Sequence, residues 1–286
     1  MTAAATTDLS ALRARLKGAG QDHLLTFEAR LSDAERGVLL EQIKAIDLAA
    51  LPRWIEAYVK HKGDTGAAST GAIEPAPYYP LRPGAFDRAA YRAKGEALIS
   101  AGKVAAFTVA GGQGSRLGYE GPKGCYPAGS VTRKSLFACL AEWILAAQRK
   151  WGSGKVIPWY IMTSPINHEA TLAFFEQHAY FGLAKRDVMF FPQGVMPALE
   201  MGTGRILLDQ PGAIALAPDG HGGSLRALHT SGALADMRAR GVEHLSYTQI
   251  DNPLVRVIDP TFIGLHAFAP DSSAQMSSKM VTKAHA

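Results

Sequence analysis

The stretch TVAGGQGSRLGYEGPKG, residues 108–124, decides the fold and indicates where a site lies. It follows an apolar run at 104–109 that predicts a buried strand. Its glycines let the backbone turn tightly and bring N–H groups close to a ligand without interference from a Cβ atom. A glycine-rich turn after a strand is usually only a turn. Arg116 and Lys123 favour more than that, because a forked guanidinium and an ammonium both suit phosphate oxygens.

Downstream of this stretch, short apolar runs alternate with helical patterns. We expect strands at 103–109, 156–162, 187–191 and 245–250, and helices at 134–149, 167–180 and 224–240. Alternation of this kind predicts βαβ units, and therefore an α/β fold with a doubly wound, mostly parallel sheet. Ligands bind such sheets beyond the carboxyl ends of the strands, so the segments that follow the strands are the candidates for a site.

The first 84 residues have a different character. Ser32 and Glu35 predict a capping box ahead of apolar residues at helical spacing, and a second helix is expected from Pro52 through Val59. Residues 62–84 are rich in glycine, proline and small polar residues, which predicts a linker or a long surface loop. We therefore expect a helical N-terminal segment with its linker at 1–84 and a second domain at 85–286.

Composition and charge argue against several classes of protein. No run approaches ~18 uncharged apolar residues, so the sequence predicts no transmembrane helix, and its first residues lack a signal-peptide pattern. The 30 Lys and Arg against 25 Asp and Glu leave a formal charge of +5 without a basic run, which makes nucleic-acid binding a weak interpretation. Cys125 and Cys139 are the only cysteines and form no C-x-x-C pair. They argue against a disulfide framework and zinc, and favour the cytoplasm.

Five blocks of the sequence, in order, resemble the eukaryotic-type UDP-sugar pyrophosphorylases, the UDPGP family. The first block contains QGSRLG, PKG and RKSLF, and the others are the segments 158–183, 188–199, 217–228 and 247–264. Within the family, the chain is most similar to the branch that acts on N-acetylglucosamine 1-phosphate. The resemblance covers roughly residues 75–286 and implies a Rossmann-like nucleotide-diphosphosugar transferase fold for the domain at 85–286.

The resemblance implies a uridylyltransferase, a nucleotidyltransferase that makes a UDP-sugar and pyrophosphate from UTP and a sugar 1-phosphate with Mg²⁺ as cofactor. N-acetylglucosamine 1-phosphate is the expected sugar substrate, and glucose 1-phosphate or a broad range of sugars is the alternative. Such transfer depends on positioning and electrostatics more than on covalent chemistry. By resemblance, Arg116 and Lys123 are catalytic and hold the triphosphate and the charge of the transition state. The alternative is that both are surface cations.

Further site residues follow from the positions that match the family. In the family, the backbone that contacts uracil and ribose corresponds to Val109, Ala110, Gly111 and Gly112. Gln193 matches a glutamine that recognises uracil, whose donor and acceptor groups an amide can complement. Asp251 matches an aspartate beside the ribose and the magnesium-linked phosphates, and a carboxylate is a natural metal ligand. An Asx turn before Pro253 is the alternative interpretation of Asp251.

A second glycine-rich loop, Asp-Gly-His-Gly-Gly at 219–223, matches the sugar site of the family. Gly220 corresponds to a nucleotide-contacting glycine, and Gly222 keeps the floor of the site bare for a sugar. The acetylglucosamine enzymes usually have asparagine where this chain has His221, whereas the UDP-glucose and broad-range enzymes have Gly-His-Gly. The departure puts N-acetyl specificity in question and leaves uridylyl transfer unaffected.

The family continues well past the block with which this sequence ends. We therefore expect a chain that is incomplete at its C-terminus: truncated, the product of a fragmentary gene, or dependent on a partner. One alternative function is a UTP-binding fragment without catalysis. A dinucleotide-dependent oxidoreductase is a remote alternative, because no acidic residue closes a second strand ~20 residues after the glycines. A guanylyl or adenylyl transferase would share the chemistry, but Gln193 favours uracil.

Overall fold

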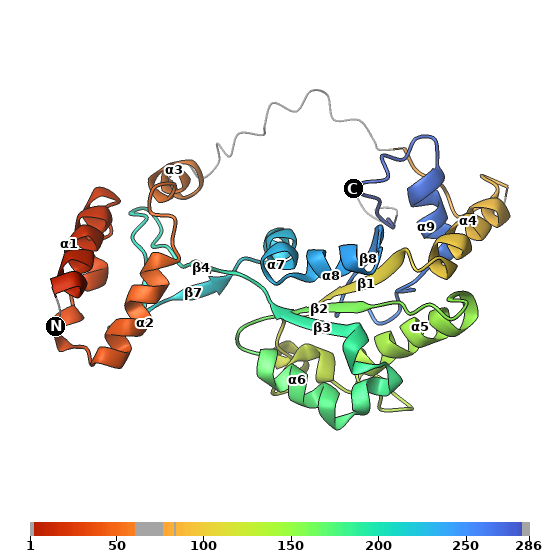
Figure 1. The fold of residues 1–286 in the computed structure, drawn as a ribbon, viewed down its shortest axis with the longest axis horizontal. Coiled ribbons are helices and arrows are strands. Elements are labelled where there is room, and N and C mark those ends of the chain that lie inside the picture. The colour runs from red at the N-terminus through yellow and green to blue at the C-terminus, as the bar shows by residue number, and fades with distance from the viewer. Residues whose placement is uncertain (1–2, 61–76, 83, 282–286) are drawn as a thin grey trace. The chain divides into compact units, whose positions relative to one another are not determined.

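The computed structural model describes residues 3–60, 77–82 and 84–281 (Figure 1). The chain divides into two compact units. The first consists of Met1–Pro75 with Val195–Asp219, and the second of Ala76–Gly194 with Gly220–Ala286. All the predicted site residues belong to the second unit. Within the described ranges, no helix has both the length and the apolar character needed to cross a bilayer.

The second unit is built on a four-stranded parallel sheet. Its strands lie in the order β3-β2-β1-β8, with bounds β1 (Val104–Val109), β2 (Trp159–Thr163), β3 (Val188–Pro192) and β8 (His244–Gln249). Each coincides closely with a strand predicted from the sequence. β1 and β2 are buried along their whole length, as expected for central strands that are covered on both faces.

Helices pack on both faces of the sheet, which confirms the predicted doubly wound α/β fold. One face is covered by α4 (Arg88–Ser100), α5 (Leu136–Trp151), α6 (His168–Gln177) and α9 (Pro260–Phe268). The other is covered by α7 (Ser224–Thr230) and α8 (Ala233–Ala239). In Figure 1, α5 and α6 lie on the opposite side of the strands from α7 and α8. Along β1, Ala106 packs with the first group and Phe107 with the second, the period of two that a strand imposes.

The prediction of one helix over 224–240 was wrong, because two helices occupy this range. Gly232 interrupts them, with a left-handed backbone (φ 83°) that an L-residue with a side chain adopts only at a cost. Here the glycine both follows α7 and stands at the N-terminal end of α8. Helical periodicity continues across such a break, so the apolar pattern did not reveal it.

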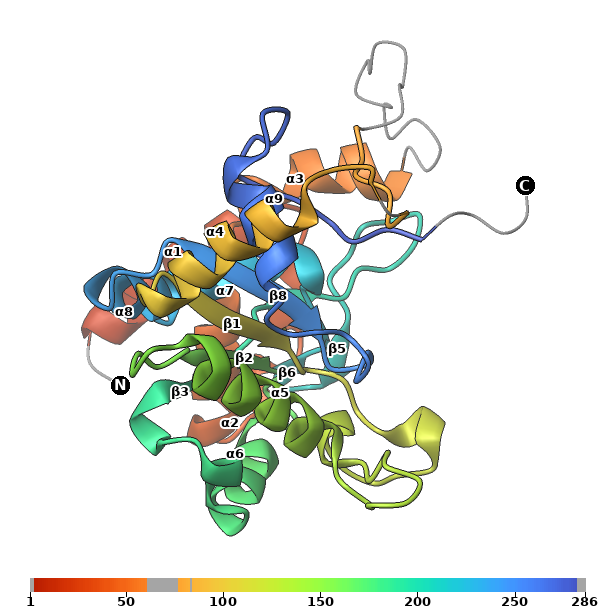
Figure 2. The same cartoon turned by 90° about the vertical axis from the view of Figure 1, so that its right-hand side faces the viewer.

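Helices α4 and α9 form a close pair that the sequence analysis did not predict (Figures 1 and 2). Each begins after an aspartate whose side chain caps it: Asp87 accepts from the backbone of its helix, as does Asp259. They touch through glycines. A Cβ atom on Gly95 would lie 1.8 Å from the carbonyl oxygen of Pro260, so only glycine permits this approach.

The first unit combines helices with short antiparallel strands. Its elements are α1 (Ala3–Gly18), α2 (Asp33–Lys44), α3 (Leu51–Trp54), a π-helical turn (Ile55–Lys60), β4 (Val195–Pro197) paired with β7 (Leu216–Pro218), and β5 (Leu208–Gln210) paired with β6 (Ala213–Ile214). The predicted capping box is present, since Ser32 and Glu35 bond each other reciprocally at the start of α2.

The segment Val195–Asp219 packs with the N-terminal helices, whereas the sequence analysis assigned it to the domain at 85–286. Its Ile206 and Ile214 are buried in one apolar cluster with helix residues such as Leu39. The buried Gln21 also accepts a hydrogen bond from the Ile206 N–H at 2.8 Å and donates one to the Gly204 carbonyl at 3.1 Å. Contacts between segments so far apart in the chain leave no local pattern in the sequence. The linker expected at 62–84 lies largely outside the described residues.

Candidate functional site

Three loops of the second unit leave the sheet at the carboxyl ends of its strands. Backbone bonds extend the ladders beyond β1 and β8: the Ala110 N–H donates to Met162 at 2.7 Å, and the Ile250 N–H donates to Val109 at 3.1 Å. Beside β2, the Gln193 N–H donates to the Thr163 carbonyl at 2.8 Å. These bonds place the loops after β1, β3 and β8 at one edge of the sheet.

Gly111 lies directly against the side chain of Gln193. A Cβ atom on Gly111 would be 2.9 Å from Nε2 of Gln193, closer than real Cβ contacts allow, and 3.3 Å from Oε1, which is tighter than most of them. Gln193 is buried, and its amide makes no hydrogen bond to any residue that the structure describes. Both the donor and the acceptor of this amide are therefore available at the floor of the glycine loop.

Lys123 and Asp251 face each other at the same edge. Nζ of Lys123 is 2.9 Å from Oδ1 of Asp251, and the side chains are 20% and 56% exposed. The Lys123 backbone N–H donates to the Gly112 carbonyl at 3.0 Å, which holds the lysine close to the glycine loop. A partly exposed ion pair contributes little stability, so a phosphate oxygen can replace the carboxylate at little cost.

Arg116 shares the loop but not these contacts. It lies in a 3-10 turn, Ser115–Leu117, that ends at Gly118 in a left-handed conformation (φ 66°). Its side chain is exposed and makes no ion pair or hydrogen bond with any residue in the described ranges. The structure thus brings Lys123 and Asp251 together and leaves Arg116 as a free cation on the loop between β1 and Lys123.

The second glycine-rich loop is shaped by the backbone of Gly220 and by a tyrosine. Gly220 has φ 64° and ψ −155°, a region of backbone conformation that is essentially restricted to glycine. Next to it, Nδ1 of His221 is hydrogen-bonded to the hydroxyl of Tyr247 on β8, and both side chains are exposed. Gly222 has open space where a side chain would stand. Tyr247, which the sequence analysis did not identify, therefore orients the histidine of the loop.

Asn167 is a second residue that the sequence analysis missed. It is fully buried in the turn after β2, and its Nδ2 donates to the carbonyls of Ala110 at 3.1 Å and Gly112 at 3.2 Å. Its Oδ1 accepts from the Ser164 N–H at 2.8 Å. A polar side chain just after a predicted strand was the available signal, since that is where such sheets bind ligands.

Asp251 is the side chain predicted to hold a metal. Within the described residues, no three His, Cys, Asp or Glu side chains gather into a metal site. Mg²⁺ usually keeps several waters and binds one or two carboxylates together with substrate phosphates. One exposed carboxylate opposite a lysine fits this way of binding, in which the protein and the phosphates of the ligand hold the metal jointly.

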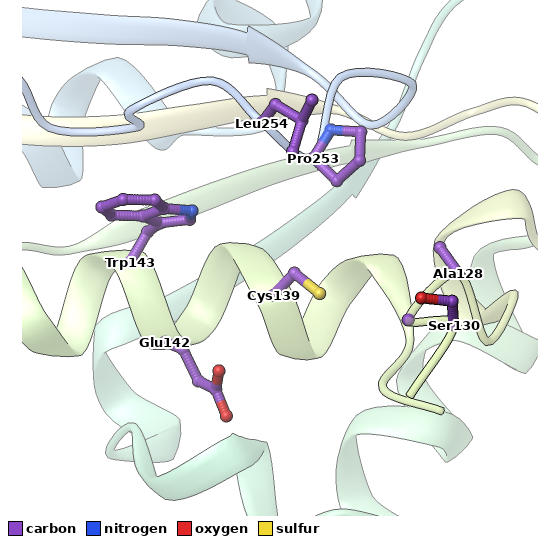
Figure 3. A pocket seen from close by; sticks show the side chains of 8 residues that line it. Ala128, Ser130, Cys139, Glu142, Trp143, Pro253 and Leu254 are labelled. Carbon is purple, nitrogen blue, oxygen red and sulfur yellow. The ribbon is translucent and has the colours of Figure 1, made fainter. Parts of the chain in front are cut away.

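A separate pocket lies near the loop that follows Asp251 (Figure 3). It is lined by Ala128, Gly129, Ser130, Cys139, Glu142, Trp143, Pro253 and Leu254. In Figure 3, Trp143 projects from the side of α5 that faces Pro253 and Leu254, whereas Glu142 points away from them. No predicted site residue contributes to its lining, so this pocket is distinct from the glycine-loop site.

Comparisons with known proteins give consistent matches. The sequence pattern of the UDPGP family, described as UTP–glucose-1-phosphate uridylyltransferase, matches residues 56–285. UDP-N-acetylglucosamine diphosphorylase 2 of Arabidopsis thaliana is 38% identical over 288 residues, 96% of this chain and 56% of that protein. UDP-N-acetylglucosamine pyrophosphorylase of Saccharomyces cerevisiae is 35% identical over 274 residues, 93% of this chain and 57% of that protein.

Similarity to a solved structure agrees with these sequence matches. The crystal structure of the uridine diphosphate N-acetylglucosamine pyrophosphorylase of Trypanosoma brucei, in complex with an inhibitor, aligns with a TM-score of 0.70 at 32% identity. The alignment covers 88% of this chain and 53% of that one. The chain thus spans about half the length of the relatives it matches.

Proposed function

Because the chain belongs to the UDPGP family of UTP–glucose-1-phosphate uridylyltransferases, we propose that it forms a UDP-sugar and pyrophosphate from UTP and a sugar 1-phosphate. Relatives named for UDP-N-acetylglucosamine favour N-acetylglucosamine 1-phosphate as the sugar substrate. The observation that carries the proposal is the arrangement at one sheet edge, where the glycine loop packs against Gln193 and Lys123 faces Asp251.

The amide of Gln193, which has no partner among the described residues, suits uracil as the base. Uracil presents an N3–H donor flanked by carbonyl acceptors, and a glutamine amide offers one acceptor and a donor group to match them. Gly111 leaves the space in which this amide lies. In this proposal, the backbone at Val109, Ala110, Gly111 and Gly112 contacts the base and the ribose, and Gly220 contacts the nucleotide from the second loop.

Lys123 and Arg116 are proposed to bind the phosphates. An oxygen of the sugar phosphate attacks the α-phosphorus of UTP in line, a new P–O bond forms, and the bond to the bridging oxygen breaks as pyrophosphate leaves with the electron pair. A sugar phosphate is already an anion near neutral pH, so the attack needs no general base. Lys123 exchanges its carboxylate partner for a phosphate oxygen, and the exposed Arg116 adds a second cation.

Asp251 is proposed to bind Mg²⁺ jointly with the phosphates. When bound, the cation neutralises negative charge on the phosphate oxygens during transfer. Asp251, the carboxylate that Lys123 gives up on binding a phosphate, would then be available to hold the metal. A cytoplasmic location is part of the proposal, supported by two cysteines that are both free thiols.

The sugar is proposed to bind at the second glycine-rich loop. The open space at Gly222 leaves room beside His221, whose ring Tyr247 orients. The Gly-His-Gly pattern at 220–222 favours a second candidate substrate, glucose 1-phosphate, because the sequence resemblance associates this pattern with UDP-glucose and broad-range enzymes.

Pyrophosphate release from UTP and Mg²⁺ tests the proposal, with N-acetylglucosamine, glucose and galactose 1-phosphates supplied in turn. UTP binding is measured by calorimetry on the same protein. We expect UTP binding and release with N-acetylglucosamine 1-phosphate. Release with glucose 1-phosphate alone would select the second candidate. UTP binding without release from any sugar would identify a nucleotide-binding fragment, and the absence of both would overturn the proposal.

A further inference from the structure

We propose that Asn167 is a positioning residue that aims the backbone N–H groups of the glycine loop at the nucleotide. The inference deepens the proposed function and rests on it for the identity of the ligand. Asn167 lies in the turn after β2, on the opposite side of the loop backbone from the atoms that would meet a ligand. It acts through the carbonyls of Ala110 and Gly112, which its Nδ2 binds at 3.1 and 3.2 Å.

Because of the geometry of the peptide bond, the two bonds from Asn167 also fix the direction of two backbone N–H groups, those of Gly111 and Gln113. In a trans peptide, the carbonyl of one residue and the N–H of the next point to opposite sides of the backbone. Because the Ala110 carbonyl points to Asn167, the N–H of Gly111 points away from it. The Gly112 carbonyl is fixed in the same way, so the N–H of Gln113 also points away.

The N–H groups of the loop are free to bind a ligand. The N–H groups of Gly111, Gly112 and Gln113 make no hydrogen bond with any residue in the described parts of the chain. The carbonyls of Ala110 and Gly112, by contrast, both accept from Asn167. Successive unpartnered N–H groups form a concavity that binds acceptors such as phosphate or carbonyl oxygens. Without the amide of Asn167, the peptide between Ala110 and Gly111 would lose the bond that fixes its carbonyl, and the peptide between Gly112 and Gln113 would be held only by the bond from the Lys123 N–H.

Asn167 is itself held rigidly. Its side chain has no exposed surface, and its Oδ1 accepts from the Ser164 N–H at 2.8 Å. Its own carbonyl accepts from the hydroxyl of Thr171, one turn into α6, at 2.7 Å. Hydrogen bonds in such a dry environment are strong, and an unsatisfied partner is costly, so the amide has one stable orientation. Asn167 thereby connects the glycine loop to the end of β2 and to the first turn of α6, which hold it in place.

Two substitutions of Asn167 distinguish the effect of losing its hydrogen-bond donor from the effect of losing side-chain volume. Asn167→Ala removes the whole amide. Asn167→Asp keeps the size of the side chain and the acceptor for Ser164, but turns an oxygen toward two carbonyl oxygens. Thr171→Val is the matched control, because it removes a buried hydrogen bond of the same turn without touching the glycine loop.

Two readouts distinguish positioning from general stability. The first is the Kd for UTP by calorimetry with Mg²⁺ present. The second is amide hydrogen exchange at Lys123, whose N–H is protected by its bond to the Gly112 carbonyl and so reports on the loop without any ligand. Thermal unfolding of each variant is recorded beside them.

We expect the Kd for UTP to rise on the order of tenfold in both Asn167 variants, with faster exchange at Lys123. Thr171→Val should lower the melting temperature and leave both readouts at their parental values. Parental affinity and exchange in a folded Asn167→Asp would overturn the inference, even where Asn167→Ala does not fold. If the parent binds no UTP, the proposed function fails, and the exchange at Lys123 alone decides whether Asn167 fixes the loop.

Discussion

The side-chain amide of Gln193 lies so close to Gly111 that a Cβ atom on the glycine would stand 2.9 Å from Nε2. The backbone of Gly111 is not left-handed, so its neighbour and not its own conformation requires glycine here. The next glycine differs. A Cβ on Gly112 would meet atoms of Lys123 at 3.5 Å, which is ordinary contact.

Gly111→Ala should therefore displace the Gln193 amide and weaken UTP binding. We expect a rise in Kd of about tenfold, similar to that of Gln193→Ala, because each substitution removes the same recognition. A double-mutant cycle measured by calorimetry checks the mechanism. In the double variant the added methyl group no longer meets an amide, so the two effects should fall well short of their sum. Additive losses would show that Gly111 acts independently of Gln193.

Lys123→Ala should reduce pyrophosphate release by on the order of 10²–10³, as expected when one donor to the charge of the transition state is lost. Initial rates at saturating UTP, Mg²⁺ and sugar 1-phosphate measure the effect. A variant within a few-fold of the parent would remove Lys123 from the proposed mechanism.

Lys103→Ala is the matched control for that experiment. Nζ of Lys103 lies 2.6 Å from Oε1 of Glu243, so it too forms a partly exposed lysine–carboxylate pair. It stands just before β1, at the end of the sheet away from the glycine loop. We expect its loss to leave the rate unchanged, because an exposed pair contributes ~0–1 kcal/mol to stability and nothing here to the site.

Tyr247→Phe should affect the sugar and spare the nucleotide. The substitution removes the hydroxyl that binds Nδ1 of His221 and leaves the aromatic ring against Phe107 in place. We expect the KM for the sugar 1-phosphate to rise several-fold, which corresponds to the ~1 kcal/mol typical of one hydrogen bond, with the Kd for UTP unchanged. His221→Ala should raise this KM by a similar factor. Adding Tyr247→Phe to His221→Ala should raise the KM little further. A change confined to UTP binding would contradict the placement of His221 beside the sugar.

Local patterns predicted the strands and some helix ends, whereas the contacts that shape the site are non-local. The apolar run before Gly111 and the capping box of Ser32 are both local signals, and both were sufficient. The rule that ligands bind beyond the carboxyl ends of strands indicated only the segments after the strands, and the family resemblance pointed to Gln193 and Asp251 within them. The bonds from Asn167 to the glycine loop join residues on different strand ends, so only the folded chain shows them. The packing of Val195–Asp219 on the N-terminal helices is non-local for the same reason.

The two cysteines should differ sharply in reactivity. Burial raises the pKa of the Cys125 thiol to about 12, and burial followed by the nearby Glu142 carboxylate raises that of Cys139. The thiolate is the reactive form, so a raised pKa lowers the reactive fraction at any pH below it. In native protein we expect a disulfide reagent to modify Cys139 slowly, faster as pH rises, and to reach Cys125 only on unfolding. Mass spectrometry of the labelled peptides measures this, and equal labelling of the two would refute the burial of Cys125.

The same glycine-to-alanine change should have opposite effects in two helices. Gly37 lies in α2 with no atom within 4 Å of an added Cβ, whereas a Cβ on Gly95 in α4 would lie 1.8 Å from the Pro260 carbonyl oxygen. Gly37→Ala should stabilise its helix by up to ~1 kcal/mol, because alanine loses less backbone entropy on folding. Gly95→Ala should destabilise by ~1–3 kcal/mol, since α4 and α9 must separate. Denaturant-dependent hydrogen exchange measures the free energy of unfolding separately for α2 and for α4, which belong to different units. Stabilisation by Gly95→Ala would refute the glycine-mediated contact of α4 with α9.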